Sequence, residues 1–477
     1  MGINWIDILI FLSYMAAMLG VGFYFMKKNK TGEDYYVGGR NMSAGHIGLS
    51  VVATDVGGGF SIGLGGLGFV MGLSGSWMLF TGLLGAWISA VLLIPKVYKV
   101  GLENKFQSFP QILKHYYNGN VAIIAGIISF IGYIGFTSSQ ILAGAKLASA
   151  TFPEFSLNSA VLLMGVIAVT YTVLGGIKAV IYTDTIQWLV LILGLCFIGI
   201  PMGYYKLGGW ESIQANLPSE FFSLSNISIS QIINWLVTIV PVWFIGMTLY
   251  QRIFACKDEK TAKRAWRIAG LFEWPIMAFM GVILGLFAKV AYQQGVFTNF
   301  GYAPGAKIDA ELGLPLFLRH VFPIGMVGLM MSVYFSAIMS TADSCLMAAS
   351  GNLTTDILKD KTFFSRNKIR FSQLITLIVG GTAILLATVM TSVLDLMLYS
   401  YAFMVSGLFI PVLGMLFLKK PSPIAAIISM ISGGLTTLIL ILSEISLPFD
   451  LDANIFGISV SLINFIIFQL VFSKKSY

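Results

Sequence analysis

The amino-acid sequence predicts an all-α polytopic membrane protein with thirteen transmembrane helices. Of its 477 residues, 57% are hydrophobic and only 10% are charged, whereas soluble domains average roughly 45–50% apolar and about 25% charged residues. The apolar residues form long runs separated by short charged loops, and the basic residues favour alternate loops. Together these three observations are typical of a chain that crosses a bilayer many times.

Thirteen apolar runs are candidate spans, because about 20 residues of helix cross the hydrocarbon core of a bilayer. The runs cover residues 4–26, 44–70, 74–97, 120–150, 156–177, 179–204, 229–251, 267–292, 323–357, 369–391, 393–418, 422–445 and 453–473. The first run is too long for a signal peptide and lacks a small-residue cleavage site. We therefore expect it to be retained as a span.

Lysine and arginine predict the orientation, because cytoplasmic loops carry an excess of both. With the N-terminus outside, most of the 29 basic residues fall on the cytoplasmic side, among them a basic loop from Arg252 to Arg267. The exceptions are Lys146, Lys206, Lys289, Lys307 and Arg319. We expect the N-terminus outside and the C-terminus in the cytoplasm. The net charge of +8 follows from the same bias, so no nucleic-acid binding is expected.

The residues give no support to an enzyme. The three cysteines, Cys196, Cys256 and Cys345, follow no metal-binding spacing, and the three histidines are far apart in sequence. The chain has no nucleotide-binding loop and no nucleophile–base pair that could be recognised from sequence.

A polar stretch in the ninth run, from Phe335 to Ser350, is the strongest candidate site. On a helix, Ala337, Ser340, Thr341 and Ser344 share one face, and the carboxylate of Asp343 lies beside it. Hydroxyl and carboxylate oxygens suit a hard cation, and an ionisable group inside a span indicates a functional site. For the hydroxyls alone, helix–helix packing is the alternative.

The second run predicts a broken helix at mid-membrane. Asp55 is followed by Gly57, Gly58 and Gly59, and three consecutive glycines are very poor helix formers. A break at this depth is tolerated only where it lines a cavity or is buried in protein. Its freed carbonyls can coordinate a cation, and the half-helix ends can face a solute.

Polar side chains elsewhere in the runs are open to two interpretations. Thr137, Ser138, Ser139 and Gln140 could line a cavity or hydrogen-bond a neighbouring helix. Asp184 could cap a helix or supply an oxygen to a cation near Ser344.

The aromatic residues are equally open. Trp243 follows Pro241, which is expected to bend its helix, and it could form the wall of a solute chamber or simply pack. Tyr399 and Tyr401 could gate a pathway or belong to an interfacial aromatic belt. Glu273 is assigned no role.

Three segments resemble the sodium/solute symporter family, which includes bacterial proline and sialic acid carriers and sodium/glucose cotransporters. They are GGIKAVIYTDTIQ (175–187), SAIMSTADS (336–344) and DYYVGGRNMS (34–43). The resemblance implies a leucine-transporter-like fold of two inverted five-helix repeats with broken helices at the midplane. In that fold, one transporter domain covers 1–477, with a first span and loop at 1–43, repeats at 44–204 and 229–418, and two peripheral spans at 419–477.

The resemblance also implies where sodium binds. The main site maps onto the carbonyls of Ala53, Val56 and Ala337 and the hydroxyls of Ser340 and Thr341. A second sodium site, which some members have, maps onto Asp184, Asp343 and Ser344. Because Asp343 replaces a hydroxyl of certain members, it could strengthen a cation site or bind a proton.

The solute is less constrained. Sugar-carrying members place amide and carboxylate side chains where this chain has Phe60 and the apolar stretch 77–80, which offers a sugar few hydrogen bonds. We expect sodium-coupled import of an amino acid, an amine or a carboxylate by alternating access. The candidate solute-binding residues are Asp55, Gly57, Gly58, Phe60, Trp243, Tyr399 and Tyr401.

A proton-coupled carrier of the same fold and a sugar symporter are the alternatives. An ion channel is less favoured, since the buried polar groups cluster at mid-depth instead of crossing the membrane. The expected partners are a small solute, co-transported sodium ions and the lipid bilayer, with the monomer as the functional unit. We expect a prokaryotic plasma (inner) membrane location.

Overall fold

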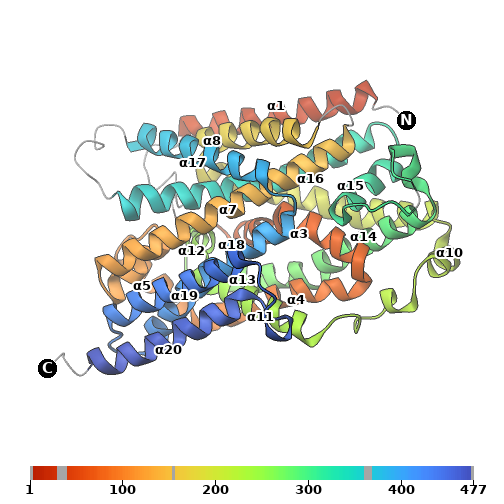
Figure 1. Cartoon of the computed structure of the whole chain (residues 1–477). Coiled ribbons are helices and arrows are strands. Elements are labelled where there is room, and N and C mark those ends of the chain that lie inside the picture. The colour runs from red at the N-terminus through yellow and green to blue at the C-terminus, as the bar shows by residue number, and fades with distance from the viewer. Residues whose placement is uncertain (1–3, 29–39, 153–155, 304, 359–367, 474–477) are drawn as a thin grey trace.

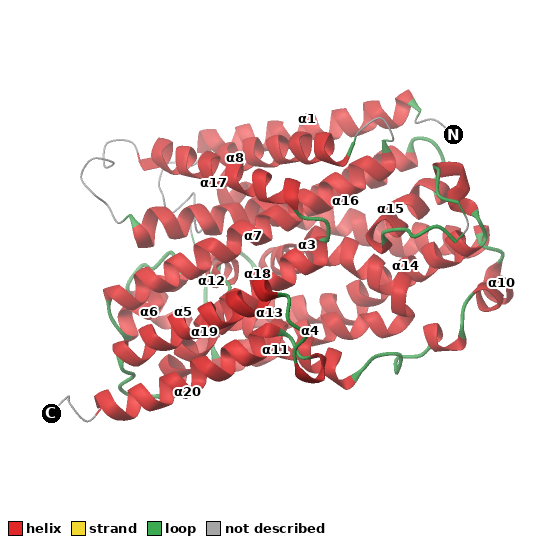
Figure 2. Ribbon diagram, in the orientation of Figure 1, coloured by secondary structure: helices red, strands yellow, loops and turns green. Residues whose placement is uncertain are grey.

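The computed structural model describes residues 4–28, 40–152, 156–303, 305–358 and 368–473. Within these ranges the regular structure is helical, apart from one isolated bridge between Met42 and Cys256. The long helices run side by side along one axis (Figures 1 and 2). Helix α1 begins at one end of this bundle and α20 ends at the other (Figure 1).

The α-helices are numbered in chain order. They are α1 (Trp5–Lys28), α3 (Ala44–Met71), α4 (Trp77–Leu92), α5 (Ile94–Glu103), α6 (Phe109–Tyr116), α7 (Gly119–Thr151), α8 (Leu157–Gly194), α9 (Ile200–Lys206), α10 (Gly209–Asn216), α11 (Ile229–Ile245), α12 (Met247–Ala255), α13 (Glu259–Leu271), α14 (Ala278–Gln293), α15 (Ala310–Val321), α16 (Met326–Gly351), α17 (Lys368–Val389), α18 (Val393–Phe417), α19 (Pro423–Ser443) and α20 (Ala453–Ser473).

Short 3₁₀ and π segments connect several of these helices. The 3₁₀ turns are η1 (Gly72–Ser76), η3 (Ser219–Phe222), η5 (Val296–Phe300) and η8 (Pro448–Asp450), and the π-helical turns are η2 (Leu195–Gly199), η4 (Phe272–Met277) and η6 (Asn352–Ile357).

Nine segments in the described part of the chain are long and apolar enough to cross a bilayer. The pair α11 and α12, which is bent by 43°, makes a tenth if it counts as one span. Two shorter apolar helices cover Trp5–Met18 and Leu157–Val173. The chain is therefore a polytopic helical membrane protein, and the number thirteen stays a prediction.

One of the nine segments, Ile62–Leu92, contains a reversal of the chain. Gly72 has φ +67°, which favours glycine, and it separates α3 from α4. Gly68 of α3 and Gly75 beyond the turn both face Val282 of α14. Because α3 and α4 also both pack along α13, they form two antiparallel arms.

The long helix α8 also reverses. The Tyr171 hydroxyl lies 3.4 Å from Thr183 Oγ1, although the two residues are 12 positions apart. A straight α-helix would separate their Cα atoms by about 18 Å, which is beyond the reach of these side chains. The chain therefore turns back between them. Gly175 and Gly176 fall in this interval.

Helix α16 occupies the centre of the bundle. It packs against α1, α3, α7 and α8, and 83% of its span is buried, compared with 17% for α20. Asp7 of α1 caps its start, because Asp7 Oδ1 accepts hydrogen bonds from the N–H groups of Gly325 and Gly328 at 2.8 and 2.7 Å. A carboxylate at a helix N-terminus satisfies free N–H groups and the helix dipole.

The break between α11 and α12 differs from the sequence expectation. The chain stays helical through Pro241 and bends instead at Gly246, whose backbone is extended. The bend turns the short helix α12 toward the bundle interior. As a consequence, Arg252 is fully buried in α12 and does not begin a cytoplasmic loop.

Candidate functional site

Helix α3 is broken at Gly57, as the glycine run predicts. Gly57 has φ +29° and ψ −159°, with helical residues on both sides. A Cβ atom at Gly57 would lie 2.1 Å from Thr341 Oγ1 of α16, so a side chain has no room there. The freed N–H of Gly58 donates a 2.9 Å hydrogen bond to Oε1 of Gln140 in α7. The side chain of Phe60 lies outside the described residues.

Three of the five residues predicted for the main sodium site, Ala53, Ala337 and Thr341, meet beside this break. The Thr341 hydroxyl donates a 2.8 Å hydrogen bond to the Ala53 carbonyl and lies 3.5 Å from the Ala337 carbonyl. Ser340 is buried, and its Oγ lies toward the Asp184 side chain without a hydrogen bond of regular geometry to any described residue. Val56 lies outside the residues whose side chains are described. Two carbonyls and one hydroxyl therefore converge on a single point between α3 and α16.

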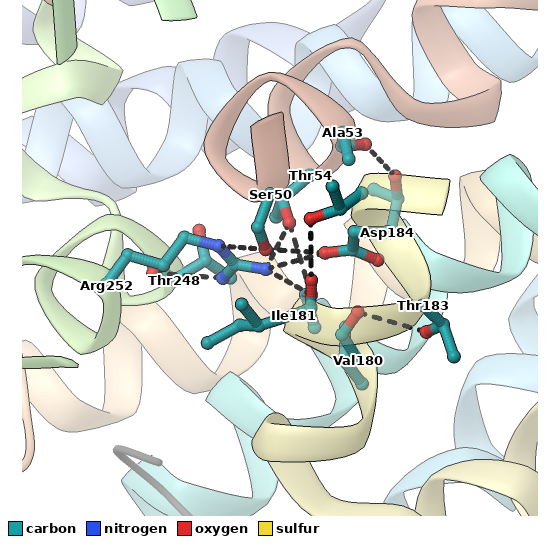
Figure 3. Close-up of polar contacts among 12 residues, drawn as sticks. Ser50, Ala53, Thr54, Val180, Ile181, Thr183, Asp184, Thr248 and Arg252 are labelled. Carbon is teal, nitrogen blue, oxygen red and sulfur yellow. Dashed lines mark hydrogen bonds and ion pairs between the residues drawn. The ribbon is translucent and has the colours of Figure 1, made fainter. Parts of the chain in front are cut away.

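A buried arginine forms the second centre of the site. The Arg252 guanidinium is fully buried and contacts residues of three other helices (Figure 3). Its Nε donates to Ser50 Oγ at 3.1 Å, and its Nη2 donates to Thr54 Oγ1 at 2.5 Å. The same Nη2 donates to Ser344 Oγ at 2.9 Å and lies 3.6 Å from Asp184 Oδ2.

Two of the three residues predicted for a second sodium site, Asp184 and Ser344, lie against this guanidinium. Asp184 accepts a 2.5 Å hydrogen bond from Ser50, and its Oδ1 has no partner among the described residues. Ser344 Oγ lies between Arg252 and Thr54 Oγ1, which is 3.2 Å away.

Asp343 has a different partner from Asp184 and Ser344. It accepts a 2.5 Å hydrogen bond from Thr172 of α8. Asp343 and Asp184 nevertheless act on each other electrostatically. The structure thus places Asp184 and Ser344 beside Arg252, and Asp343 beside Thr172 within electrostatic range of Asp184.

Asp55 has an acidic neighbour that the sequence did not reveal. Asp55 is buried in α3 just before the break, and Glu273 is fully buried in η4. The two carboxyl groups interact with each other. Asp55 Oδ2 and both Glu273 carboxyl oxygens accept no hydrogen bond from any other described residue, so the two carboxyl groups have only each other as partners. Gly82 of α4 leaves the space for Glu273, because a Cβ atom there would lie 1.8 Å from Glu273 Oε2.

The predicted aromatic residues occupy different environments. Tyr401 is buried and makes a T-shaped contact with Phe136, with ring centroids 4.9 Å apart. It also interacts electrostatically with Asp55 and Glu273. Trp243 is buried against Trp266, with ring centroids 6.2 Å apart. Tyr399 is 45% exposed and lies away from the site.

The hydroxyls before Gln140 bond to their own helix. Thr137 donates to the Tyr133 carbonyl and Ser139 donates to the Phe136 carbonyl. Of this cluster, Gln140 is the residue that reaches the break in α3. Hydrogen bonds within α7 and from α7 to α3 therefore account for the polar groups of this cluster.

Four site residues were missed in the sequence: Ser50, Thr54, Thr172 and Arg252. Ser50 and Thr54 are four residues apart and lie two turns and one turn before the break, so their shared face gives a signal that could have been found. Arg252 gives none, because it stands at the end of an apolar run where a basic loop begins.

A family model described as "Sodium:solute symporter family" matches residues 35–433. The osmoregulated proline transporter OpuE of Bacillus subtilis (strain 168) is 28% identical and aligns over 99% of this chain and 96% of its own length. A sodium/glucose cotransporter of Vibrio parahaemolyticus is 25% identical over 94% of this chain and 87% of its own length.

The fold has a close counterpart among solved structures. A Na+-coupled sialic acid symporter in a substrate-bound outward-open state superposes with a TM-score of 0.79, 23% identity and 98% coverage of both chains. The named relatives are transporters and not enzymes. Because the family model spans most of the sequence, the chain belongs to the sodium:solute symporter family of membrane transporters.

Proposed function

We propose that the protein is a sodium-coupled secondary active symporter that imports a small organic solute by alternating access. The observation that carries the proposal is the hydrogen bond from Thr341 to Ala53, made where α3 is broken. Carbonyl and hydroxyl oxygens are the ligands that a hard cation prefers. Broken helices with free carbonyls are the usual location of sodium sites in such folds.

The main sodium site consists of the Ala53, Val56 and Ala337 carbonyls with the Ser340 and Thr341 hydroxyls. In the sodium-bound form the Thr341 hydroxyl donates its proton to the Ala337 carbonyl one turn earlier, as membrane-helix hydroxyls commonly do. The Thr341 hydroxyl oxygen then directs a lone pair toward the ion, and the Ala53 carbonyl oxygen also points toward it. The buried Ser340 Oγ, which lies toward Asp184, supplies a further oxygen.

Sodium at this point links the two halves of the transport machinery. The ion holds the break in α3 against α16, and the solute site lies on the same break. Binding of either ligand therefore favours binding of the other, and this coupling is reciprocal. At −100 mV each inward positive charge contributes about 2.3 kcal/mol to accumulation.

The favoured solute carries an amine, as an amino acid or an amine does. Two buried carboxyl groups, Asp55 and Glu273, lie against each other near the break, and three of their oxygens have no other described partner. A buried carboxylate without a partner is costly, and an ammonium group would satisfy it. Sugars are disfavoured because Met78 and Leu79 are apolar and fully buried. Trp77 does not line the proposed solute site, since its Nε1 donates a hydrogen bond to the Leu224 carbonyl at an exposed position.

The proposed topology has the N-terminus outside and the C-terminus in the cytoplasm of a prokaryotic plasma membrane. Helix α1 begins and α20 ends at opposite ends of the bundle (Figure 1), which requires an odd number of crossings. We place two inverted five-helix repeats at 44–204 and 229–418, which the chain reversals at Gly72 and between Tyr171 and Thr183 support. The monomer is the proposed functional unit.

A thermal-shift screen of the purified full chain tests the proposal. Amino acids, amines, carboxylates and sugars are each added in sodium chloride and, as the matched control, in potassium chloride at the same concentration. Ligands that bind the folded state raise its unfolding temperature. We expect an amine-bearing solute to raise it in sodium and much less in potassium. Equal shifts in both salts would contradict sodium coupling and favour the proton-coupled alternative.

A further inference from the structure

The oxygens around Arg252 include those that a second sodium ion would need. The guanidinium binds Ser344 and faces Asp184, two of the three residues of the predicted second site. It also binds Ser50 and Thr54 (Figure 3). A guanidinium has only donors, so each of these contacts uses a lone pair that could otherwise coordinate a cation.

The guanidinium is fixed in this position by its burial. Arg252 and Asp184 are both fully buried, and a buried charge must stay paired because desolvation is costly. Its Nη1 donates to the Thr248 carbonyl of its own helix at 3.2 Å. The bend at Gly246 directs α12, and with it this side chain, into the bundle.

We propose that the Arg252 guanidinium fills the position of a second sodium ion, so that the chain binds one sodium ion per transport cycle. This inference rests on the proposed sodium-coupled function. Two unit charges about 4 Å apart repel strongly enough to weaken binding by roughly a thousand-fold at an effective dielectric constant of about 20. Arg252 donates no hydrogen bond to Thr341, so the main sodium site remains available to its ion.

The count of bound ions on the purified full chain tests the proposal, with ²²Na⁺ alone as the probe. The wild-type chain should bind one sodium ion at saturation, with a Hill coefficient near one. Arg252→Gln removes the charge and leaves Asp184 without its cation, so it should bind two ions. Arg252→Lys keeps the charge and, as the matched control, should bind one. Asp184→Asn in the Arg252→Gln background should return the count to one.

Several outcomes would overturn the inference. Two ions on the wild-type chain would show that the guanidinium does not exclude the second, whatever the behaviour of the variants. A folded Arg252→Gln chain that still binds one ion would show that Arg252 does not control the count. If Arg252→Gln fails to fold, the wild-type and Arg252→Lys counts decide. If the wild-type chain shows no saturable ²²Na⁺ binding at all, the proposed sodium-coupled function itself is contradicted.

Discussion

The hydroxyl of Thr341 donates a 2.8 Å hydrogen bond to the carbonyl oxygen of Ala53, 288 residues earlier in the chain. The contact joins the central helix α16 to the one point at which α3 is broken. It brings together oxygens from two helices, without histidine or cysteine, at a buried position. A hard monovalent cation is the ligand that this chemistry favours.

Gly57 should tolerate no side chain. An alanine Cβ would lie 2.1 Å from Thr341 Oγ1 and would be strained at φ +29°. We expect Gly57→Ala to abolish sodium binding, measured with ²²Na⁺. Gly381→Ala is the matched control, because no atom lies within 4 Å of its Cβ position in α17. It should leave binding unchanged. Normal sodium binding by Gly57→Ala would mean that the close approach of α3 and α16 is not needed.

Ser340 should contribute directly to sodium affinity. Hydrogen-bond-type interactions with charged groups contribute about 1.5–3 kcal/mol, so Ser340→Ala should raise the sodium dissociation constant roughly 10- to 100-fold. Ser332→Ala is the control, since that hydroxyl bonds the Gly328 carbonyl of the same helix at 2.5 Å. A titration with ²²Na⁺ compares the two variants. Equal affinities would remove Ser340 from the ligand set.

Glu311 should stabilise the fold away from the ion site. It accepts hydrogen bonds from the Val393 and Leu394 N–H groups at the start of α18 and pairs with Lys146 at 2.6 Å. Both partners of the ion pair are buried. Breaking a buried pair costs about 3–5 kcal/mol when a charge is left alone, and the cost is smaller here because Lys146 also pairs with Asp309 at 2.6 Å.

We therefore expect Glu311→Gln to lower the thermal unfolding midpoint of the purified chain clearly. Glu259→Gln breaks a partly exposed pair with Lys263 and should change stability by less than about 1 kcal/mol. Similar midpoints for the two variants would show that the Glu311 contacts add little to stability.

Glu273 should select the solute and not the ion. Replacing it with glutamine keeps the shape of the side chain but removes one of two neighbouring buried carboxylates. We expect Glu273→Gln to weaken the binding of an amine-bearing solute at least 10-fold while ²²Na⁺ binding stays near the wild-type level. Unchanged solute affinity would separate Glu273 from the solute site.

Much of the candidate ion site could be predicted because its signals are local. Three glycines in an apolar run predict the break in α3, and helical spacing places Thr341 and Ser344 on one face of α16. Both do face α3, through Ala53 and Thr54. Tyr399 and Tyr401 show the limit of this reasoning. Residues two apart on a helix point in nearly opposite directions, and Tyr401 alone is buried.

The features of the candidate site that the sequence did not predict depend on contacts between segments far apart in the chain. The bend that carries Arg252 inward occurs at Gly246, not at Pro241, and no spacing in the sequence indicates it. Asp343 is paired with Thr172, and Glu273 adjoins Asp55, only because the helices are packed together. A charge near the end of an apolar run can lie in a loop or in the core, and packing decides which.

The response of thermal stability to sodium tests the central claim most directly. At a concentration 100 times its dissociation constant, a ligand of the folded state stabilises it by about 2.7 kcal/mol. The wild-type chain should unfold at a higher temperature in sodium chloride than in potassium chloride of equal concentration, and Thr341→Ala should lose this difference. A wild-type chain that responds equally to both salts, or a Thr341→Ala chain that keeps the full sodium response, would contradict a sodium site between α3 and α16.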